Sequence, residues 1–218
     1  FGHKGVEKLE NDSYRVRGGD YIARDYDIEP DVSAACYFYA LAAATGKRAM
    51  VKRMRKESLQ GDMKFISLLE KMGCTVSWER DGRQNLWLKG PDGKLKGMEV
   101  KMSDFSDQAL TLAAIAPFAD SEVTIKGIAH IRGQESDRIK VIVDELAKMG
   151  ILCNELPDGV KIHPGTPKNT NIETYNDHRV AMSFAVTGLA GDGMTILNPM
   201  CCKKTFAGFF DEIDRLEE

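Results

Sequence analysis

Two short segments combine arginines with acids at points where a helix is expected to begin. Arg-Gly-Gln-Glu-Ser-Asp-Arg at 132–138 contains Glu135 and ends at Arg138, and Asn-Asp-His-Arg at 176–179 ends at Arg179. An arginine in the first turn opposes the positive end of the helix dipole, so we interpret both arginines as directed at an anionic ligand. Exposed ion pairs, each worth under about 1 kcal/mol, are the alternative. The recurrence at two equivalent helix starts favours a site.

Further polar residues accompany these arginines. Asp107 and Glu135 are candidate acid or base groups, and Lys204 adds a cation. His178 is either a proton-transfer group or a spacer, and the residues alone leave both open. We predict that five side chains lie on one face, where the apolar helices begin, with the guanidinium groups within reach of one bound anion. They are Asp107, Glu135, Arg138, Arg179 and Lys204.

A repeated pattern is expected to position this chemistry. An aspartate opens an alanine-rich apolar run three times, at Asp31, Asp107 and Asp177, with spacings of 76 and 70 residues. Phe-Gly at 1–2 and Met-Gly at 72–73 and 149–150 form a second marker with a similar period. Asp107 is a candidate N-cap, and Asp137 and Asp177 could also be simple caps. The two markers predict one supersecondary unit used repeatedly.

The second unit has the clearest pattern. Residues 109–119 are almost entirely apolar, which predicts a helix buried on every side. A strand is expected at 121–127, and an amphipathic helix at 137–149. Two short strands, 151–155 and 159–163, follow it. The first unit matches, with a helix from Asp31, a strand at 48–52, a helix at 62–72 and a hairpin through Asp81 and Gly82.

The third unit is incomplete in this pattern. It has a helix from Asp177, a strand at 194–197 and a second helix from Lys204 onward, and its closing hairpin is missing. Residues 1–28 instead hold a hairpin-like stretch without a helix. We therefore expect segment 6–16 to pair beside 194–197, within the chain or by exchange with a second copy. The fold class is α+β with α/β-type repeats, in which three apolar helices lie inside and sheets form the outer walls.

Composition excludes several classes of protein. The 218 residues are 43% apolar and 29% charged with a net charge of −3, so the basic surface that nucleic acid requires is absent. No apolar run approaches a membrane span. Five cysteines, an odd number without CxxC spacing, favour reduced thiols in a cytoplasm over disulfides or a zinc site.

The polar segments resemble signature segments of a known family, 5-enolpyruvylshikimate-3-phosphate synthase (3-phosphoshikimate 1-carboxyvinyltransferase). They are 132–139, Tyr-Asn-Asp-His-Arg-Val-Ala-Met at 175–182, Asn-Pro-Met-Cys-Cys-Lys-Lys-Thr-Phe at 198–206, Asp-Val-Ser-Ala-Ala-Cys-Tyr-Phe at 31–38, Gln-Gly-Asp at 60–62 and Ser-Asp-Gln-Ala at 106–109. The resemblance runs in order through the whole chain and covers the C-terminal half of a family member. It implies an inside-out α/β barrel of three βαβαββ units. Residues 29–218 would be the C-terminal lobe, and 1–28 a hairpin and crossover remaining from the N-terminal lobe. The start at Phe1, without a methionine, is typical of a piece of a longer protein.

The resemblance also implies a reaction. The 5-hydroxyl of shikimate 3-phosphate adds to C2 of phosphoenolpyruvate as C3 is protonated, and phosphate then leaves. Arg138, Arg179 and Lys204 match the cations that hold phosphoenolpyruvate. Asp107 matches the carboxylate that binds the shikimate hydroxyls and accepts a proton, and Glu135 matches the acid or base that serves C3.

Three further positions belong to the implied substrate site. His178 is adjacent to the phosphoenolpyruvate cations, and Gln134 and His130 lie near the shikimate phosphate or ring. Gln134 stands where a lysine or histidine is usual in the family, and His130 where many members carry an asparagine. No cofactor or metal is expected, and the chain should be inactive without the N-terminal lobe. A UDP-N-acetylglucosamine enolpyruvyl transferase relative and a stand-alone anion-binding or scaffold domain are the alternatives.

Overall fold

Three alanine-rich helices form the centre of the molecule. The computed structural model describes residues 5–19, 22–79 and 84–216. The central helices are α1 (Val32–Thr45), α3 (Ala109–Ile115) and α5 (His178–Ala190). Each of them contacts the other two. Every residue of α3 is buried, as the apolar run at 109–119 predicts. Pro117 lies in a short 3₁₀ helix, η2 (Ala116–Phe118), that ends the run.

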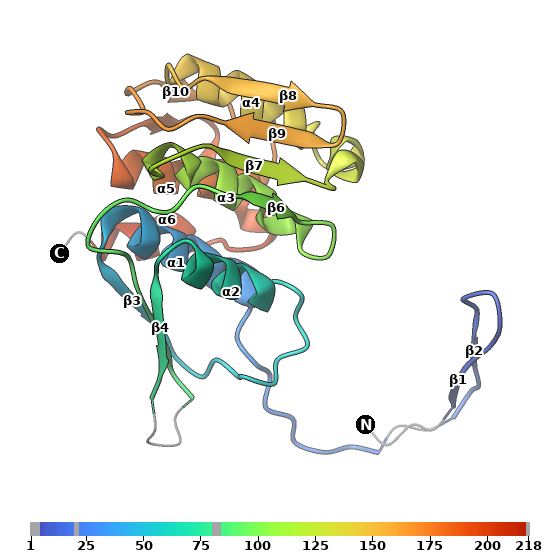
Figure 1. Ribbon diagram of the computed structural model, residues 1–218. Helices are drawn as coiled ribbons and strands as arrows, with labels where there is room; N and C mark the ends of the chain where they lie inside the picture. Colours follow the sequence, from blue (N-terminus) through green and yellow to red (C-terminus); the bar gives the residue numbers. More distant parts are fainter. Residues whose placement is uncertain (1–4, 20–21, 80–83, 217–218) are drawn as a thin grey trace.

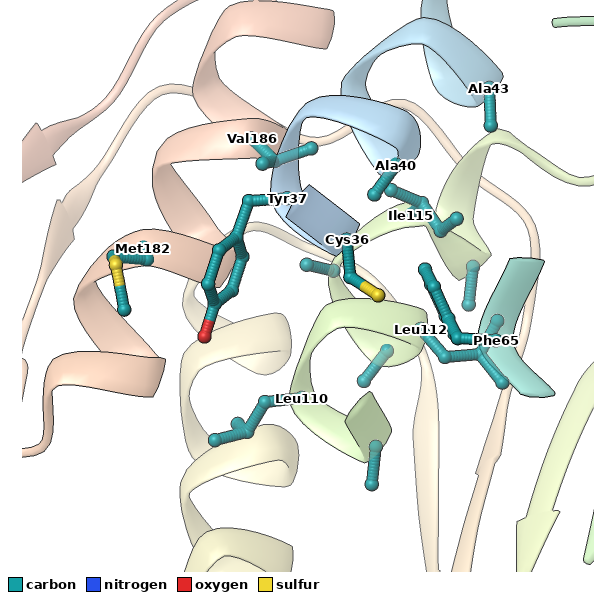
Figure 2. Packing of buried hydrophobic residues seen from close by; sticks show 14 of the residues in the cluster. Cys36, Tyr37, Ala40, Ala43, Phe65, Leu110, Leu112, Ile115, Met182 and Val186 are labelled. Atoms are coloured by element: carbon teal, nitrogen blue, oxygen red, sulfur yellow. The ribbon is translucent and has the colours of Figure 1, made fainter. Parts of the chain in front are cut away.

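Small side chains allow the central helices to approach closely. Figure 2 shows Cys36 and Ala40 of α1 packed toward Leu112 and Ile115 of α3. Ala40 is fully buried. A larger side chain there would have to displace a neighbouring helix, at a cost of about 1–3 kcal/mol.

Two of the three predicted aspartate caps are confirmed. Asp137 accepts from the backbone N–H of Lys140 at 3.1 Å, and Asp177 accepts from that of Arg179 at 2.9 Å. Asp31, before α1, likewise accepts from the backbone N–H of Ala34 at 3.2 Å. Asp107 is not a cap, because it lies within a 3₁₀ turn, η1 (Ser106–Gln108), that precedes α3. Its carboxylate turns instead to arginine side chains, as described below.

Two sheets and two amphipathic helices surround part of this core (Figure 1). The strands and helices are β3 (Arg48–Val51), α2 (Met63–Lys71), β4 (Thr75–Trp78), β5 (Leu86–Lys89), β6 (Glu99–Lys101), β7 (Val123–Lys126), η3 (Ala129–Gly133), α4 (Arg138–Lys148), β8 (Cys153–Leu156) and β9 (Gly159–Ile162). The first sheet has the order β3-β5-β4 and is antiparallel. The second has the order β6-β7-β9-β8, in which only β6 and β7 are parallel among the described pairs. The predicted turn through Asp81 and Gly82 lies outside the described residues, as does the Phe-Gly marker at 1–2.

The C-terminal part differs from the prediction in two ways. Its elements are β10 (Asn171–Ile172), β11 (Thr195–Ile196), a 3₁₀ helix η4 (Pro199–Lys204) and α6 (Phe209–Asp214). Lys204 ends η4 and does not open a helix, because Pro199 favours an early tight turn and α6 begins five residues later. The strand β11 pairs in parallel with β10. A two-residue strand such as β10 leaves no alternating pattern in the sequence.

The N-terminal hairpin forms but does not fill the predicted place. The strands β1 (Val6–Lys8) and β2 (Tyr14–Val16) pair antiparallel, with Val6 opposite Val16. They form a separate sheet, so the prediction that segment 6–16 pairs beside 194–197 within the chain is wrong. Figure 1 shows the hairpin apart from the helices and sheets of the core.

The arrangement has apolar helices inside and sheets outside, which is the inside-out α/β type expected. In the part of the chain that the structure describes, no helix is both long and apolar enough to cross a membrane.

Candidate active site

The N-terminal ends of the central helices converge at one end of the core. The backbone N–H of Val32, at the start of α1, donates to Gln60 Oε1 at 2.8 Å. Ser33 donates to Asp62, the residue before α2. Asp62 also accepts from Gln108 Nε2, just before α3, at 2.7 Å. Helix N-termini carry unpaired N–H groups and the positive ends of helix dipoles, so this end of the core favours anions.

Asp107 lies between the two arginines predicted from the sequence. Its Oδ2 accepts from Arg179 Nη2 at 2.8 Å, and its Oδ1 lies 3.5 Å from Arg138 Nη1. Arg138 opens the outer helix α4 and Arg179 lies in the first turn of the central helix α5, so the two helix starts come together although they are not equivalent positions of the repeat. The arginine side chains are 4% and 14% exposed, whereas that of Asp107 is 42% exposed. Asp107 is therefore the accessible edge of a largely buried cluster.

Asp177 holds Arg138 in place. Its carboxylate is fully buried and accepts from Arg138 Nε at 2.8 Å and Nη2 at 3.2 Å. It also accepts from Ser136 Oγ at 3.0 Å. Burial acts to raise the pKa of Asp177, but the hydrogen bonds and charge of Arg138 outweigh it and hold the pKa below its usual value. The ionised carboxylate and the planar guanidinium thus form a bidentate pair with a fixed orientation.

Glu135 lies between a histidine and a lysine. Its Oε2 is 2.9 Å from His178 Nδ1, and its Oε1 accepts from Lys204 Nζ. His178 directly follows Asp177 in the chain, so the glutamate cluster adjoins the arginine cluster. The five residues expected on one face are thus linked through contacts between their own side chains and through neighbouring residues.

The charges around Glu135 set its protonation state. Burial acts to raise the pKa of Glu135, but the hydrogen bond from Lys204 and the charge that His178 carries when it is protonated outweigh it, and the pKa lies below its usual value. Burial lowers the pKa of His178, partly opposed by Glu135. At neutral pH Glu135 is ionised and His178 is neutral, so the imidazole donates through Nδ1–H to the carboxylate.

Arg179 stays a cation despite its burial. Burial acts to lower the pKa of Arg179, but Tyr37, Asp107 and Asp62 together raise it above the usual value. Burial also raises the pKa of Tyr37, against the effect of the Arg179 charge. The Tyr37 hydroxyl, on α1, makes no hydrogen bond with good geometry among the described residues.

Gln134 and His130, the two residues expected near the shikimate phosphate or ring, have different partners. Gln134 Oε1 accepts from Arg138 Nη1, so this glutamine belongs to the arginine cluster. His130 Nε2 lies 2.8 Å from Ser106 Oγ, beside Asp107, and this pair is exposed. The structure therefore brings all eight sequence-predicted residues to the same end of the core.

A polar hollow of about 410 Å³ adjoins Asp107, and Ser106, Asp62 and Ser33 also line it. Larger hollows, of about 890, 620 and 910 Å³, lie elsewhere among the described residues. None of the eight predicted residues lines any of them, so size does not identify the site here.

The group Glu135, Asp177 and His178 has ligand atoms within 4.8 Å of one another, a spacing that a metal ion could use. Arg138 and Lys204, however, already occupy these carboxylates. Two adjacent cations oppose a metal ion and favour an anion.

Sequence reasoning missed the second roles of several residues. Asp177 was predicted only as a cap, and Ser136 and Asp62 had no predicted role. A buried carboxylate that both caps a helix and binds an arginine leaves the same sequence signal as a simple cap. A buried arginine such as Arg138 needs a buried counter-charge, and this requirement is the signal that could have identified Asp177.

The chain matches the family described as EPSP synthase (3-phosphoshikimate 1-carboxyvinyltransferase) over residues 2–213. It is 44% identical over 217 residues to the 3-phosphoshikimate 1-carboxyvinyltransferase of Nostoc punctiforme, covering 98% of this chain and 50% of that protein. Identity to the enzyme of the same name from Trichormus variabilis is also 44%, with 94% of this chain and 47% of that protein covered.

A solved structure of EPSP synthase from Acinetobacter baumannii superposes with a TM-score of 0.81 at 28% identity. The match covers 99% of this chain and 52% of that one. The chain thus spans about half the length of the relatives that it matches.

Proposed function

Because the chain belongs to the EPSP synthase (3-phosphoshikimate 1-carboxyvinyltransferase) family, we propose that it supplies the C-terminal half of the active site of an enolpyruvyl transferase. The observation that carries the proposal is the placement of two carboxylates, Asp107 and Glu135, each between cationic or imidazole groups at the convergent helix N-termini. The proposed reaction moves the enolpyruvyl group of phosphoenolpyruvate to the 5-hydroxyl of shikimate 3-phosphate and releases phosphate.

Arg138, Arg179 and Lys204 would hold phosphoenolpyruvate. The two guanidinium groups are preorganised, because the buried Asp177 fixes that of Arg138 and the exposed Asp107 binds that of Arg179. A bound carboxylate or phosphate would replace part of the Asp107 contact with charge-assisted hydrogen bonds. Lys204 is 63% exposed and is free to turn toward a phosphate group.

Asp107 would accept the proton of the 5-hydroxyl as that oxygen bonds to C2. Its exposed carboxylate faces the polar hollow, which would receive the shikimate ring. His130 and Gln134 would contact the shikimate phosphate or ring from the rim. The Ser106–His130 pair lies beside Asp107 and would order that side of the hollow.

Glu135 would give a proton to C3 in the addition and take one back in the elimination, when the C2–O bond to phosphate breaks and phosphate leaves with the bonding pair. In the unliganded site Lys204 lowers the pKa of Glu135. When Lys204 turns to the phosphate group, burial remains and favours the protonated carboxyl. Binding of the substrate would therefore prepare Glu135 as an acid.

We further propose that residues 29–218 are one lobe and that residues 1–28 belong to an adjoining N-terminal lobe. The separate β1–β2 sheet supports this boundary. The N-terminal lobe would complete the grip on shikimate 3-phosphate, so the chain alone would be inactive. The five free thiols are consistent with a cytoplasmic location.

Titration of the isolated chain with phosphoenolpyruvate tests this proposal. We expect saturable binding on the order of millimolar, because the cations are present but the lobe that would exclude water is not. Arg179→Ala should abolish it. Arg48→Ala, which removes a guanidinium stacked on Trp87 in the first sheet, is the matched control and should leave it unchanged. If both variants weaken phosphoenolpyruvate binding equally, the binding is nonspecific charge attraction and the proposed site is contradicted.

A further inference from the structure

The loop before α5 contains two consecutive residues in a strained conformation. Tyr175 and Asn176 have φ values of 52° and 56°, in the left-handed region that side chains disfavour. The turn closes with a hydrogen bond from the Asp177 N–H to the Thr174 carbonyl at 2.8 Å. Asp177 follows the strained pair directly, so the position of its carboxylate depends on this turn.

Glu145 of α4 binds this loop through two hydrogen bonds. Its side chain is fully buried. Its Oε1 accepts from the Tyr175 hydroxyl at 2.8 Å, and its Oε2 accepts from the Glu173 N–H at 3.3 Å. Lys148 pairs with the same carboxylate at 2.7 Å. Burial and the hydrogen bond to Glu145 raise the pKa of Tyr175, so the phenol remains a donor.

Arg138 and Glu145 lie seven residues apart on α4, which places them two turns apart on the same side of the helix. Arg138 binds Asp177 just after the strained pair, and Glu145 binds Tyr175 and Glu173 within and before it. The helix α4 therefore contacts the turn at two points, through Arg138 and Glu145. The buried Thr174 hydroxyl has no hydrogen-bond partner among the described residues, so it does not help to hold the turn.

We propose that Glu145, acting through Tyr175, is a positioning residue of the anion site: it keeps the turn in the conformation in which Asp177 orients Arg138 and caps the helix that carries Arg179. The inference rests on the proposed function for its biological meaning. Glu145 does not touch the ligand. If the turn relaxes, the fraction of molecules with correctly placed arginines falls, and the apparent affinity for an anion falls by the same factor.

Tyr175→Phe in the full chain tests the inference, because it removes only the hydroxyl. The direct measurement is hydrogen exchange of the Arg138 Nε–H, followed by ¹⁵N NMR. Loss of one hydrogen bond to a carboxylate corresponds to about a tenfold change in the equilibrium of the turn. We therefore expect exchange about tenfold faster and affinity for inorganic phosphate up to about tenfold weaker. Glu145→Gln, which keeps an acceptor oxygen, should act in the same direction and more weakly.

Tyr39→Phe is the matched control. It removes a buried hydroxyl that donates to the Leu86 carbonyl at 3.1 Å, in the first unit. It should lower Tm without altering the Arg138 exchange. Three results would overturn the inference. The exchange rate of the Arg138 Nε–H could rise less than threefold in Tyr175→Phe, it could rise equally in Tyr39→Phe, or it could already be fast in the unmodified chain. Absence of phosphate binding by the unmodified chain would count against the proposed function, while the exchange rates would still decide the role of Glu145.

Discussion

Replacing Asp177 by asparagine should destabilise the whole domain. Asp177 is fully buried and is the main counter-charge of Arg138, whose side chain is only 4% exposed. Asparagine keeps the size but leaves a buried guanidinium largely uncompensated. Removing one partner of a buried ion pair costs about 3–5 kcal/mol. Asp107, 3.5 Å from Arg138, remains as a second partner, so we expect the lower end of this range.

For a domain of this size, that loss corresponds to a decrease in Tm of about 6–20 °C. Urea unfolding followed by circular dichroism measures the free energy of unfolding, and the slope with urea should not change. Asp144→Asn is the matched control on α4, because Asp144 pairs with Lys140 at the surface at 2.9 Å. It should cost less than about 1 kcal/mol.

The pH dependence has a defined sign. The folded pKa of Asp177 is lowered, so its contribution is complete above the unfolded value, near 3.8, and is lost as the pH falls below it toward the lower folded value. Asp177→Asn should remove this part of the acid-induced loss. Adding Arg138→Met to Asp177→Asn should recover part of the stability, because the unpaired charge is gone. If the free energy of unfolding of the single variant Asp177→Asn lies within 1 kcal/mol of that of the unmodified chain, this account of the Arg138–Asp177 pair is refuted.

Lys204→Met should raise the pKa of Glu135, measured by ¹³C NMR of the carboxyl carbon, because burial then acts without the opposing cation; Lys203→Met is the control, and a pKa that stays or falls would contradict the assigned cause. Deletion of residues 1–17 should lower Tm by at most about 2 °C, because β1 and β2 form their own sheet; a larger loss, or a change of association state, would indicate that the hairpin supports the core.

The central helices and the clustering of charges could be predicted from the sequence. An all-apolar run such as 109–119 has only one stable place, inside the protein, and a helix that begins with Asp177 and Arg179 must expose that end to polar groups. The combination of acids and arginines at both helix starts, 132–138 and 176–179, indicated that Arg138 and Arg179 share one site. These inferences depend on local pattern and on burial, both of which the sequence carries directly.

The remaining features depend on contacts between distant segments. Asp107 resembles the caps Asp31 and Asp177 in the sequence, but its side chain binds arginines of two other helices. The pairing of β11 with β10 involves two residues on each side, too few for a pattern. The grip of Glu145 on Tyr175 joins residues 30 positions apart, and a buried glutamate on an amphipathic helix has no distinguishing local signal.

Phosphate release by a complemented enzyme tests the central claim most directly. The N-terminal half of the Nostoc punctiforme relative would be mixed with this chain, phosphoenolpyruvate and shikimate 3-phosphate, with the two halves of that relative as the positive control. We predict release only when both halves are present. Arg179→Ala should weaken the use of phosphoenolpyruvate, and Glu135→Ala should lower turnover more than affinity. If the relative's own halves recombine while this chain gives no release, or if both variants match the unmodified chain, the assignment of this site to enolpyruvyl transfer is contradicted.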